Sequence, residues 1–161
     1  MAPGHASLHV EREALDFAAA HFSIIGGERE TLHGHNYRVR LVAEGAVRAD
    51  GTVVDFAALK GAIRDEVARL DHRMLLPTES PVVAVDAATT PGRVEVRIGD
   101  AEFRFPARDV ALLPIPNTTC ECIAGLLLTR LRERLGGLDA RLEVRVDESP
   151  GQGASVAEAA R

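Results

Sequence analysis

Three of the six histidines lie within fifteen residues of one another: His21, His33 and His35. Side chains two residues apart on an extended segment point to the same face, so His33 and His35 would lie side by side. A third imidazole from a neighbouring strand would complete a set of three nitrogen ligands. Zinc held by three protein ligands keeps a fourth position for water or substrate, as in catalytic sites. Short H-x-H spacings also occur in ordinary strands, so other residues of the chain are needed to tell a metal site from an ordinary strand.

Four further residues are candidates for acid–base chemistry or ligand binding. Glu30 precedes His33 by three residues, where a carboxylate can remove a proton from a metal-bound hydroxyl or an adjacent carbon; the alternative is a solvated loop glutamate. Asp71 and His72 form an adjacent carboxylate and imidazole, although a histidine at a helix C-terminus also interacts with the helix dipole. Glu148 follows a predicted strand, where it can accept paired hydrogen bonds from adjacent N–H donors, as on an aminopyrimidinone ring.

The composition excludes several classes of protein. The 161 residues form a predicted single domain, 1–161, with 46% hydrophobic and 27% charged residues, as in ordinary globular proteins. A net charge of −5 and 4% aromatic residues argue against nucleic acid as a partner. There is no apolar run of about 18 residues, which argues against a membrane span. No signal-peptide pattern opens the chain, so we expect a cytoplasmic protein.

The two cysteines predict neither a structural disulfide nor a structural zinc site. Cys120 and Cys122 are separated by one residue, which is too close to cross-link distant parts of a fold. Two thiols alone also do not make a structural zinc site. They fit small residues in the first turn of a helix, where Thr118 and Glu121 have the spacing of a capping box.

Hydrophobic periodicity predicts the elements that position these residues. Residues 7–20 and 36–44 alternate as two strands joined across a loop, 24–32, which would therefore lie beside the metal. Two amphipathic helices are predicted, one after Asp55 that ends near Asp71 and one after residues 117–119 that stops at 136–137. Residues 141–146 form a final strand.

A second group of predictions concerns the connections. Within a long segment, 78–116, residues 94–98 and 101–105 predict a hairpin, and the tail, 151–161, is expected to be partly mobile. The order of elements predicts an α+β fold in which an antiparallel sheet has two helices on one face. Its open edges favour an oligomer that continues the sheet.

Six motifs, spread in order over nearly the whole chain, resemble those of the 6-pyruvoyl-tetrahydropterin synthase and 6-carboxytetrahydropterin synthase family. They are F-A-A-A-H (17–21), L-H-G-H-N-Y (32–37), V-V-D-F (53–56) with L-K (59–60), L-D-H (70–72), N-T-T-C-E (117–121) and V-D-E (146–148). The resemblance implies a tunnelling fold, in which subunits, here a homohexamer, join their sheets into a barrel with active sites between subunits. It implies action on 7,8-dihydroneopterin triphosphate.

The same resemblance assigns roles to the candidate residues. It implies that His21, His33 and His35 bind zinc, which holds the hydroxyls of the substrate's side chain. It makes Asp71 and His72 the acid–base pair. Glu148 matches the glutamate that anchors the pterin ring.

One departure from the family pattern points to a particular branch. No cysteine precedes the H-G-H motif, and Arg29 stands four residues before His33, where the 6-carboxytetrahydropterin type has its catalytic cysteine. Instead Glu30 completes E-x-x-H-G-H, as in the branch that cleaves the side chain to 6-hydroxymethyl-7,8-dihydropterin for folate synthesis. We therefore expect a zinc-dependent lyase with Glu30 as the base.

Other products and another class of protein stay open at this point. The alternatives are 6-carboxytetrahydropterin synthesis on the route to queuosine and deazapurines, with Glu30 or a thiol such as Cys120 in place of the missing cysteine, and 6-pyruvoyl-tetrahydropterin synthesis. A catalytically silent subunit that binds zinc and pterin is the alternative of another class.

Overall fold

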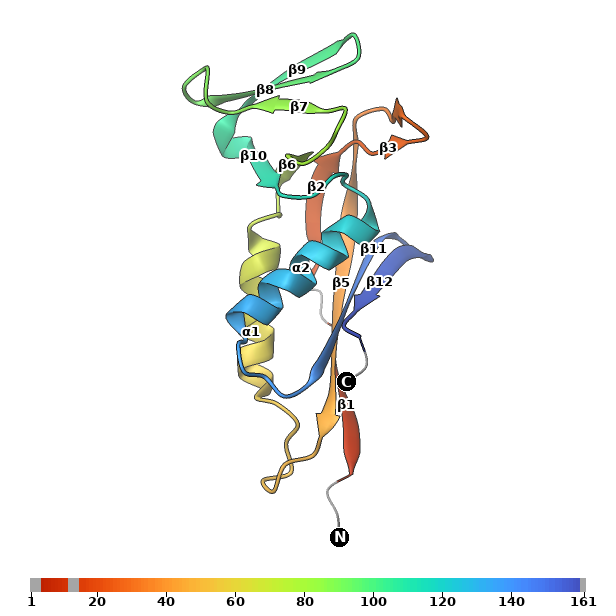
Figure 1. Cartoon of the computed structure of the whole chain (residues 1–161), viewed down its shortest axis with the longest axis vertical. Coiled ribbons are helices and arrows are strands. Elements are labelled where there is room, and N and C mark those ends of the chain that lie inside the picture. The colour runs from red at the N-terminus through yellow and green to blue at the C-terminus, as the bar shows by residue number, and fades with distance from the viewer. Residues whose placement is uncertain (1–3, 12–14, 160–161) are drawn as a thin grey trace.

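The computed structural model describes residues 4–11 and 15–159, and the long strand β5 (His33–Ala46) runs through the middle of its main sheet. The sheet has the order β10-β6-β2-β5-β11-β12, and β1 pairs with the far end of β5 (Figure 1). The other strands are β1 (His5–Glu11), β2 (Phe17–His21), β6 (Arg73–Pro77), β10 (Val110–Leu113), β11 (Arg141–Ser149) and β12 (Gln152–Ala157). The sheet thus brings both histidine motifs, on β2 and β5, into neighbouring strands.

The single strand predicted over residues 7–20 is two strands. Both are antiparallel to β5, with Glu11 opposite Arg40 and Phe17 opposite Tyr37. Five residues, 12–16, separate β1 from β2, whereas only residues 38 and 39 separate their partners on β5. Because these two lengths differ, β1 and β2 cannot form one regular strand along β5. Residues 12–14 of the predicted strand lie outside the described residues.

The predicted fold class is confirmed, with one addition to the sheet. Two pairs, β2 with β6 and β6 with β10, are parallel, while the other strand pairs of this sheet are antiparallel. Along β5 the side chains alternate as predicted: Tyr37, Val39 and Leu41 are buried in the core, and Arg38 and Arg40 lie on the opposite face. The sheet therefore has one apolar face for the helices and one polar face.

Two helices, α1 (Phe56–Ala68) and α2 (Cys120–Arg134), cover the apolar face (Figure 1). The Asp55 side chain caps α1 as predicted, accepting a hydrogen bond from the Ala57 N–H at 2.7 Å. For α2 the predicted capping box is wrong, because the N-cap is Thr119, which accepts from Cys122 N–H. Thr118 is instead buried, and its hydroxyl donates to the Phe22 carbonyl at 2.7 Å. No helix among the described residues is long and apolar enough to span a membrane.

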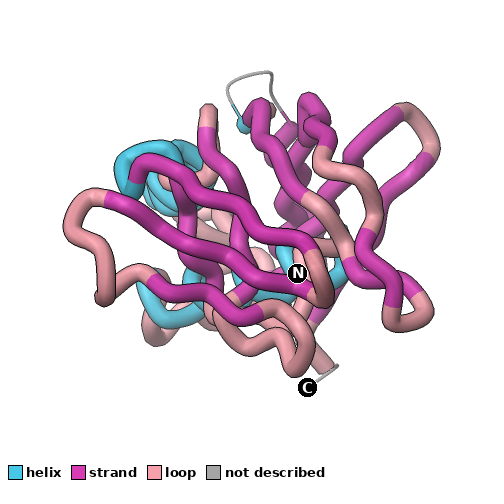
Figure 2. The backbone as a smooth tube through the Cα atoms, turned by 90° about the horizontal axis from the view of Figure 1, so that it is seen from above, coloured by secondary structure: helices cyan, strands magenta, loops and turns pink. Residues whose placement is uncertain are grey.

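The predicted hairpin within residues 78–116 is part of a separate three-stranded sheet. Its strands are β7 (Ala84–Asp86), β8 (Arg93–Ile98) and β9 (Ala101–Pro106), and β8 pairs with both neighbours. A short 3-10 helix (Ala107–Asp109) leads from β9 into β10. In Figure 1 the small sheet lies at the end of the molecule opposite the N-terminus, and the view from above shows that strands make up most of the backbone (Figure 2). The small sheet packs on a second apolar cluster that includes Phe22, Met74 and Leu76.

The tail expected to be mobile forms an edge strand instead. Residues 152–157 are β12, which pairs antiparallel with β11. Ala154 and Val156 pack against the main core, and this burial is what orders the segment. Gly153 lies so close to Asp147 that a Cβ would be 2.3 Å from its Oδ1, so a glycine is required there. Residues 160–161 of the predicted tail lie outside the described part of the chain.

Candidate metal centre and the cavity beside it

The three histidines converge at one point of the sheet. His21 on β2 pairs in register with His33 at the start of β5, and His35 follows on the same face. One ring nitrogen from each residue lies within 4.8 Å of the other two. The predicted spacing therefore does bring the three imidazoles together.

Hydrogen bonds to backbone carbonyls fix two of the rings in the form that a metal requires. Nδ1 of His21 lies 3.1 Å from the Thr118 carbonyl oxygen, and Nδ1 of His33 lies 2.7 Å from that of Thr31. A carbonyl oxygen can only accept, so each Nδ1 carries the hydrogen and each Nε2 keeps its lone pair.

His21 is also prepared electrostatically to act as a ligand. Its Nε2 is buried and has no hydrogen-bond partner within the described residues. Burial, and then the neighbouring His33, lower the pKa of His21, which keeps the imidazole neutral. An orphaned, neutral nitrogen aimed at two other imidazoles fits a metal ion, since His is a common ligand and three such donors leave an open position.

Gly34 allows the two strands that carry the histidines to lie this close. A Cβ built on Gly34 would lie 3.0 Å from the carbonyl oxygen of Ala19 on β2. A side chain between His33 and His35 would therefore push β2 away and separate His21 from the pair. This contact gives the glycine of the H-G-H motif a physical reason.

Tyr37 lies against the histidines and was not among the predicted site residues. It is fully buried, its ring centroid lies 5.8 Å from that of His21 and 5.6 Å from that of His35, and its hydroxyl has no partner among the described residues. Burial first, and then the charges of Cys120, Glu148 and Glu30, raise the pKa of Tyr37. The signal was present in the sequence, because residues 33, 35 and 37 share one face of a strand.

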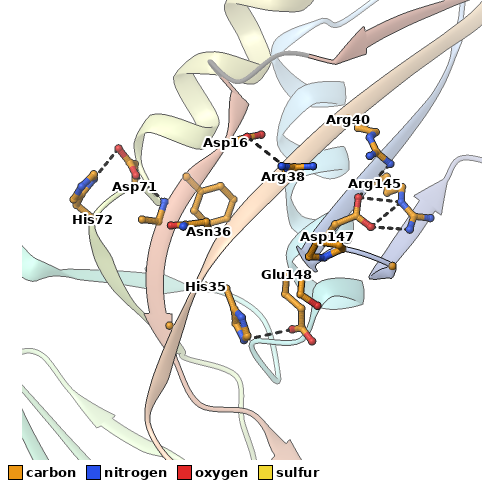
Figure 3. A pocket seen from close by; sticks show the side chains of 16 residues that line it. Asp16, His35, Asn36, Arg38, Arg40, Asp71, His72, Arg145, Asp147 and Glu148 are labelled. Atoms are coloured by element: carbon orange, nitrogen blue, oxygen red, sulfur yellow. Dashed lines mark hydrogen bonds and ion pairs between the residues drawn. The ribbon is translucent and has the colours of Figure 1, made fainter.

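Glu148 lies where the sequence placed it, at the end of β11 beside the histidines. Its Oε2 is 4.0 Å from Nε2 of His35, and the two side chains face each other in Figure 3. The Cys120 thiol donates a weak hydrogen bond to the same carboxylate at 3.7 Å. Burial and the Glu148 charge raise the pKa of Cys120 to about 12, so this thiol stays protonated.

Glu30 follows a small hairpin, β3 (Ile24–Ile25) with β4 (Glu28–Arg29), that projects beside the histidines. Its N–H donates to the Ser23 carbonyl at 2.9 Å, while the side-chain amide of Asn117 bonds both the N–H and the carbonyl of Ile24. The Glu30 side chain is exposed, and its charge is felt at Tyr37. The predicted loop therefore connects the two strands that carry the histidines, and its Glu30 carboxylate is exposed.

Asp71 and His72 contact each other but lie apart from the histidine cluster. Nδ1 of His72 is 2.9 Å from Oδ2 of Asp71, and both residues hydrogen-bond the backbone of Ala18. The Ala18 N–H is the main reason why the pKa of Asp71 is lowered. His72 has φ of 56°, the one positive φ of a non-glycine residue in the described chain, and its side chain is 83% exposed. Strained residues often mark functional positions.

A cavity of about 920 Å³ joins these two groups. His35 and Glu148 line it on one side of β2, and Asp71 and His72 line it on the other (Figure 3). The nearly buried Asp147 forms its polar wall, held by Arg145 at 2.6 Å and Arg40 at 3.3 Å. The arrangement suits a polar ligand that reaches His35 at one end.

A three-histidine group on a mixed sheet, flanked by acidic side chains and a polar cavity, could hold a metal ion, as in an enzyme of the metal-binding class. The chain matches the family model for 6-pyruvoyl tetrahydropterin synthase over residues 9–159 and belongs to this family. Its members act on the side chain of a pterin as lyases. The family predicted from the six motifs is thereby confirmed.

Relatives and solved structures agree with this assignment. A relative from Methanocaldococcus jannaschii, described as a putative 6-carboxy-5,6,7,8-tetrahydropterin synthase, is 30% identical over 87% of this chain and 88% of its own. The crystal structure of 6-pyruvoyl tetrahydropterin synthase from Plasmodium vivax superposes with a TM-score of 0.88 at 36% identity, covering 96% of this chain and 98% of its own. A dihydroneopterin monophosphate aldolase from Pyrococcus furiosus is 44% identical over 37% of this chain and 50% of its own.

Proposed function

We propose that this protein is a zinc-dependent lyase that cleaves the side chain of 7,8-dihydroneopterin triphosphate and yields 6-hydroxymethyl-7,8-dihydropterin for folate-type synthesis. The observation that carries the proposal is a carboxylate, Glu30, on the loop beside the three histidines, in a segment, 24–32, that contains no cysteine. The Plasmodium vivax enzyme supports it, since two of its structures are described as catalytic-residue mutants in which a glutamate is replaced by alanine or cysteine. The aldolase from Pyrococcus furiosus also supports cleavage chemistry.

His21, His33 and His35 are the proposed zinc ligands. Zinc, when bound, supplies a Lewis acid that holds the side-chain hydroxyls of the substrate and lowers their pKa. The carbonyls of Thr118 and Thr31 keep the imidazoles of His21 and His33 in the ligating tautomer. These three side chains therefore set where the substrate's side chain lies.

Two glutamates act at the two ends of the substrate, one on the pterin ring and one on the side chain. Glu148 accepts hydrogen bonds from adjacent N–H groups of the pterin ring and so fixes its orientation. Glu30 takes the proton of the hydroxyl on the second side-chain carbon. That carbon becomes an aldehyde as its bond to the first carbon breaks, and the electron pair stays on the first carbon, conjugated with the ring.

The product forms when the first side-chain carbon receives a proton. We assign this step to His72, paired with Asp71 at 2.9 Å, because this pair lines the same cavity as His35 and Glu148. Within the described residues β1 and β12 each pair on one side only, which supports an assembly in which sheets continue between subunits, here a homohexamer. A cytoplasmic location is part of the proposal and agrees with two unlinked cysteines.

Two other functions compete with this one. Synthesis of 6-carboxytetrahydropterin is favoured by the descriptions of relatives from Methanocaldococcus jannaschii and Pyrococcus horikoshii. It would need a substitute for the missing thiol, and Cys120, with a pKa raised to about 12 and a bond to Glu148, is a poor one. A silent subunit would bind zinc and pterin without turnover.

The deciding experiment incubates the zinc-loaded protein with 7,8-dihydroneopterin triphosphate and identifies the pterin product by mass spectrometry. We expect 6-hydroxymethyl-7,8-dihydropterin from the wild type and from Glu28→Gln, whose exposed carboxylate lies on the same hairpin. Glu30→Gln should lose turnover but keep zinc and pterin binding. A 6-carboxy or 6-pyruvoyl product would move the protein to another branch, and bound pterin without product would identify the silent subunit.

A further inference from the structure

Arg29 connects two parts of the molecule that lie far apart in the sequence. Its guanidinium carbon lies 5.2 Å from the centre of the Phe103 ring and 5.9 Å from that of Phe22. The two rings are stacked, with centroids 5.8 Å apart and planes inclined by 22°. A guanidinium within about 6 Å of an aromatic ring is attracted to its face, so the two rings fix the position of this side chain.

The same guanidinium also holds the backbone of Glu30. Nη1 of Arg29 donates to the Glu30 carbonyl oxygen at 2.7 Å. On the other side of the residue, the Glu30 N–H donates to the carbonyl of Ser23 at 2.9 Å. The main chain of Glu30 is therefore fixed at both ends, and only the side-chain torsions remain free.

Phe103 brings the small three-stranded sheet into this arrangement. It lies on β9 and stacks on Phe22, and Ile24 and Leu32 pack against the same second apolar cluster. Phe22 precedes the β3–β4 hairpin, Ile24 is its first residue, and Leu32 follows it. In Figure 1 the small sheet and this hairpin lie at the same end of the molecule. The sheet is thus a support for the loop that carries Glu30.

We propose that Arg29 is a positioning residue for Glu30, and that the β7–β9 sheet holds Arg29 in place through Phe103. The inference rests on the proposed role of Glu30 as the base. In this proposal the segment 78–116 helps to position the base. The proposal also explains why an arginine suits the position four residues before His33. A base that is displaced by about 1 Å can lose about a hundredfold in rate, so support of this kind matters.

The first test compares turnover of three variants of the zinc-loaded protein. Arg29→Met keeps an unbranched apolar stem but removes the charge and the donor, and we expect kcat to fall about 10- to 100-fold with KM and zinc content unchanged. Arg29→Lys should recover most of kcat, because an ammonium group keeps a charge over the rings and a donor for the carbonyl. Arg97→Met is the matched control, since Arg97 is exposed on β8 and pairs with Glu102, and it should behave as wild type.

A double-mutant cycle tests the link to the small sheet. Phe103→Leu keeps an apolar side chain and removes the ring, so kcat should fall by a smaller factor than in Arg29→Met. Because both residues act through one contact, the double variant should be no slower than Arg29→Met alone. Multiplied losses in the double variant, or a raised KM with lost zinc in Arg29→Met, would overturn the proposal.

Amide hydrogen exchange at Glu30 gives a result that does not depend on turnover. Its N–H should exchange faster in Arg29→Met than in wild type and Arg97→Met, because the hydrogen bond to Ser23 is no longer braced. Unchanged exchange in Arg29→Met overturns the positioning proposal whatever the activity. A wild type without turnover, in which exchange still responds to Arg29→Met, supports the positioning and overturns only the proposed function.

Discussion

The imidazole of His21 is hydrogen-bonded through Nδ1 to the backbone carbonyl of Thr118, 97 residues later in the chain. The Thr118 hydroxyl in turn donates to the carbonyl of Phe22, next to His21. These two bonds join β2 to the segment that starts α2. The orientation of one candidate ligand is therefore set by a residue that no sequence pattern connects with it.

The first prediction follows from this pair of bonds. Thr118→Val keeps the shape of the side chain but removes the donor to the Phe22 carbonyl, so the Thr118 carbonyl is held less firmly against His21. We expect zinc affinity to fall about tenfold, as for other groups that orient metal ligands. Thr118→Ser, which keeps the hydroxyl, should bind zinc like wild type. Competition with a chromophoric chelator measures the affinity, and equal values for the Val and Ser variants would contradict the prediction.

Metal content separates the two groups of histidines. We expect His21→Ala, His33→Ala and His35→Ala each to lose stoichiometric zinc, since each removes one of three converging nitrogens. His72→Ala should retain zinc, because His72 lies apart from the cluster and contacts Asp71. Elemental analysis of the purified variants measures the content. Zinc loss in His72→Ala alone would show that the ligand set is wrong.

Gly34 offers a prediction about packing. In Gly34→Ala the new methyl group would meet the Ala19 carbonyl at 3.0 Å, so β2 must shift away from β5. We expect the free energy of unfolding to fall by about 1 to 3 kcal/mol, as in other overpacked sites, together with weaker zinc binding. Gly61→Ala is the control, because that position lies within α1 with no atom near a new Cβ, and it should gain about 1 kcal/mol. Urea unfolding of the metal-free proteins measures both, and a Gly34→Ala variant as stable as wild type would refute the clash.

Reactivity of the Cys120 thiol should depend strongly on pH. Burial and the charge of Glu148 raise its pKa to about 12, and only the thiolate reacts with iodoacetamide. In a Cys122→Ser background we expect slow labelling at pH 7 and a steep rise in rate as the pH approaches 12. Adding Glu148→Gln removes the neighbouring charge, so the pKa should fall and labelling at pH 9 should speed up. Mass spectrometry follows the labelling, and fast reaction at pH 7 in the intact site would contradict the raised pKa.

Much of the fold could be predicted because hydrophobic periodicity is a local property. The alternation in β5 and the stripe of α1 depend on residues two to four positions apart, and both predictions agree with the structure. The wrong predictions concern segments whose conformation depends on residues far away in the sequence. Thr118 matches a capping box locally, but Phe22 takes its hydroxyl, and residues 152–157 look like a polar tail until β11 pairs with them.

For the candidate site too, some features follow from the sequence and others only from the tertiary structure. The sequence by itself determined the family and the residues available for chemistry: the three histidines, Glu30, the adjacent Asp71 and His72, and Glu148. Only the tertiary structure decided which of them meet, because their distances depend on strand register and on packing between segments as far apart as Arg29 and Phe103. It placed Tyr37 and Cys120 among the site residues and set Asp71 and His72 apart from the histidines, since a strand and its hydrogen bonds lie between them.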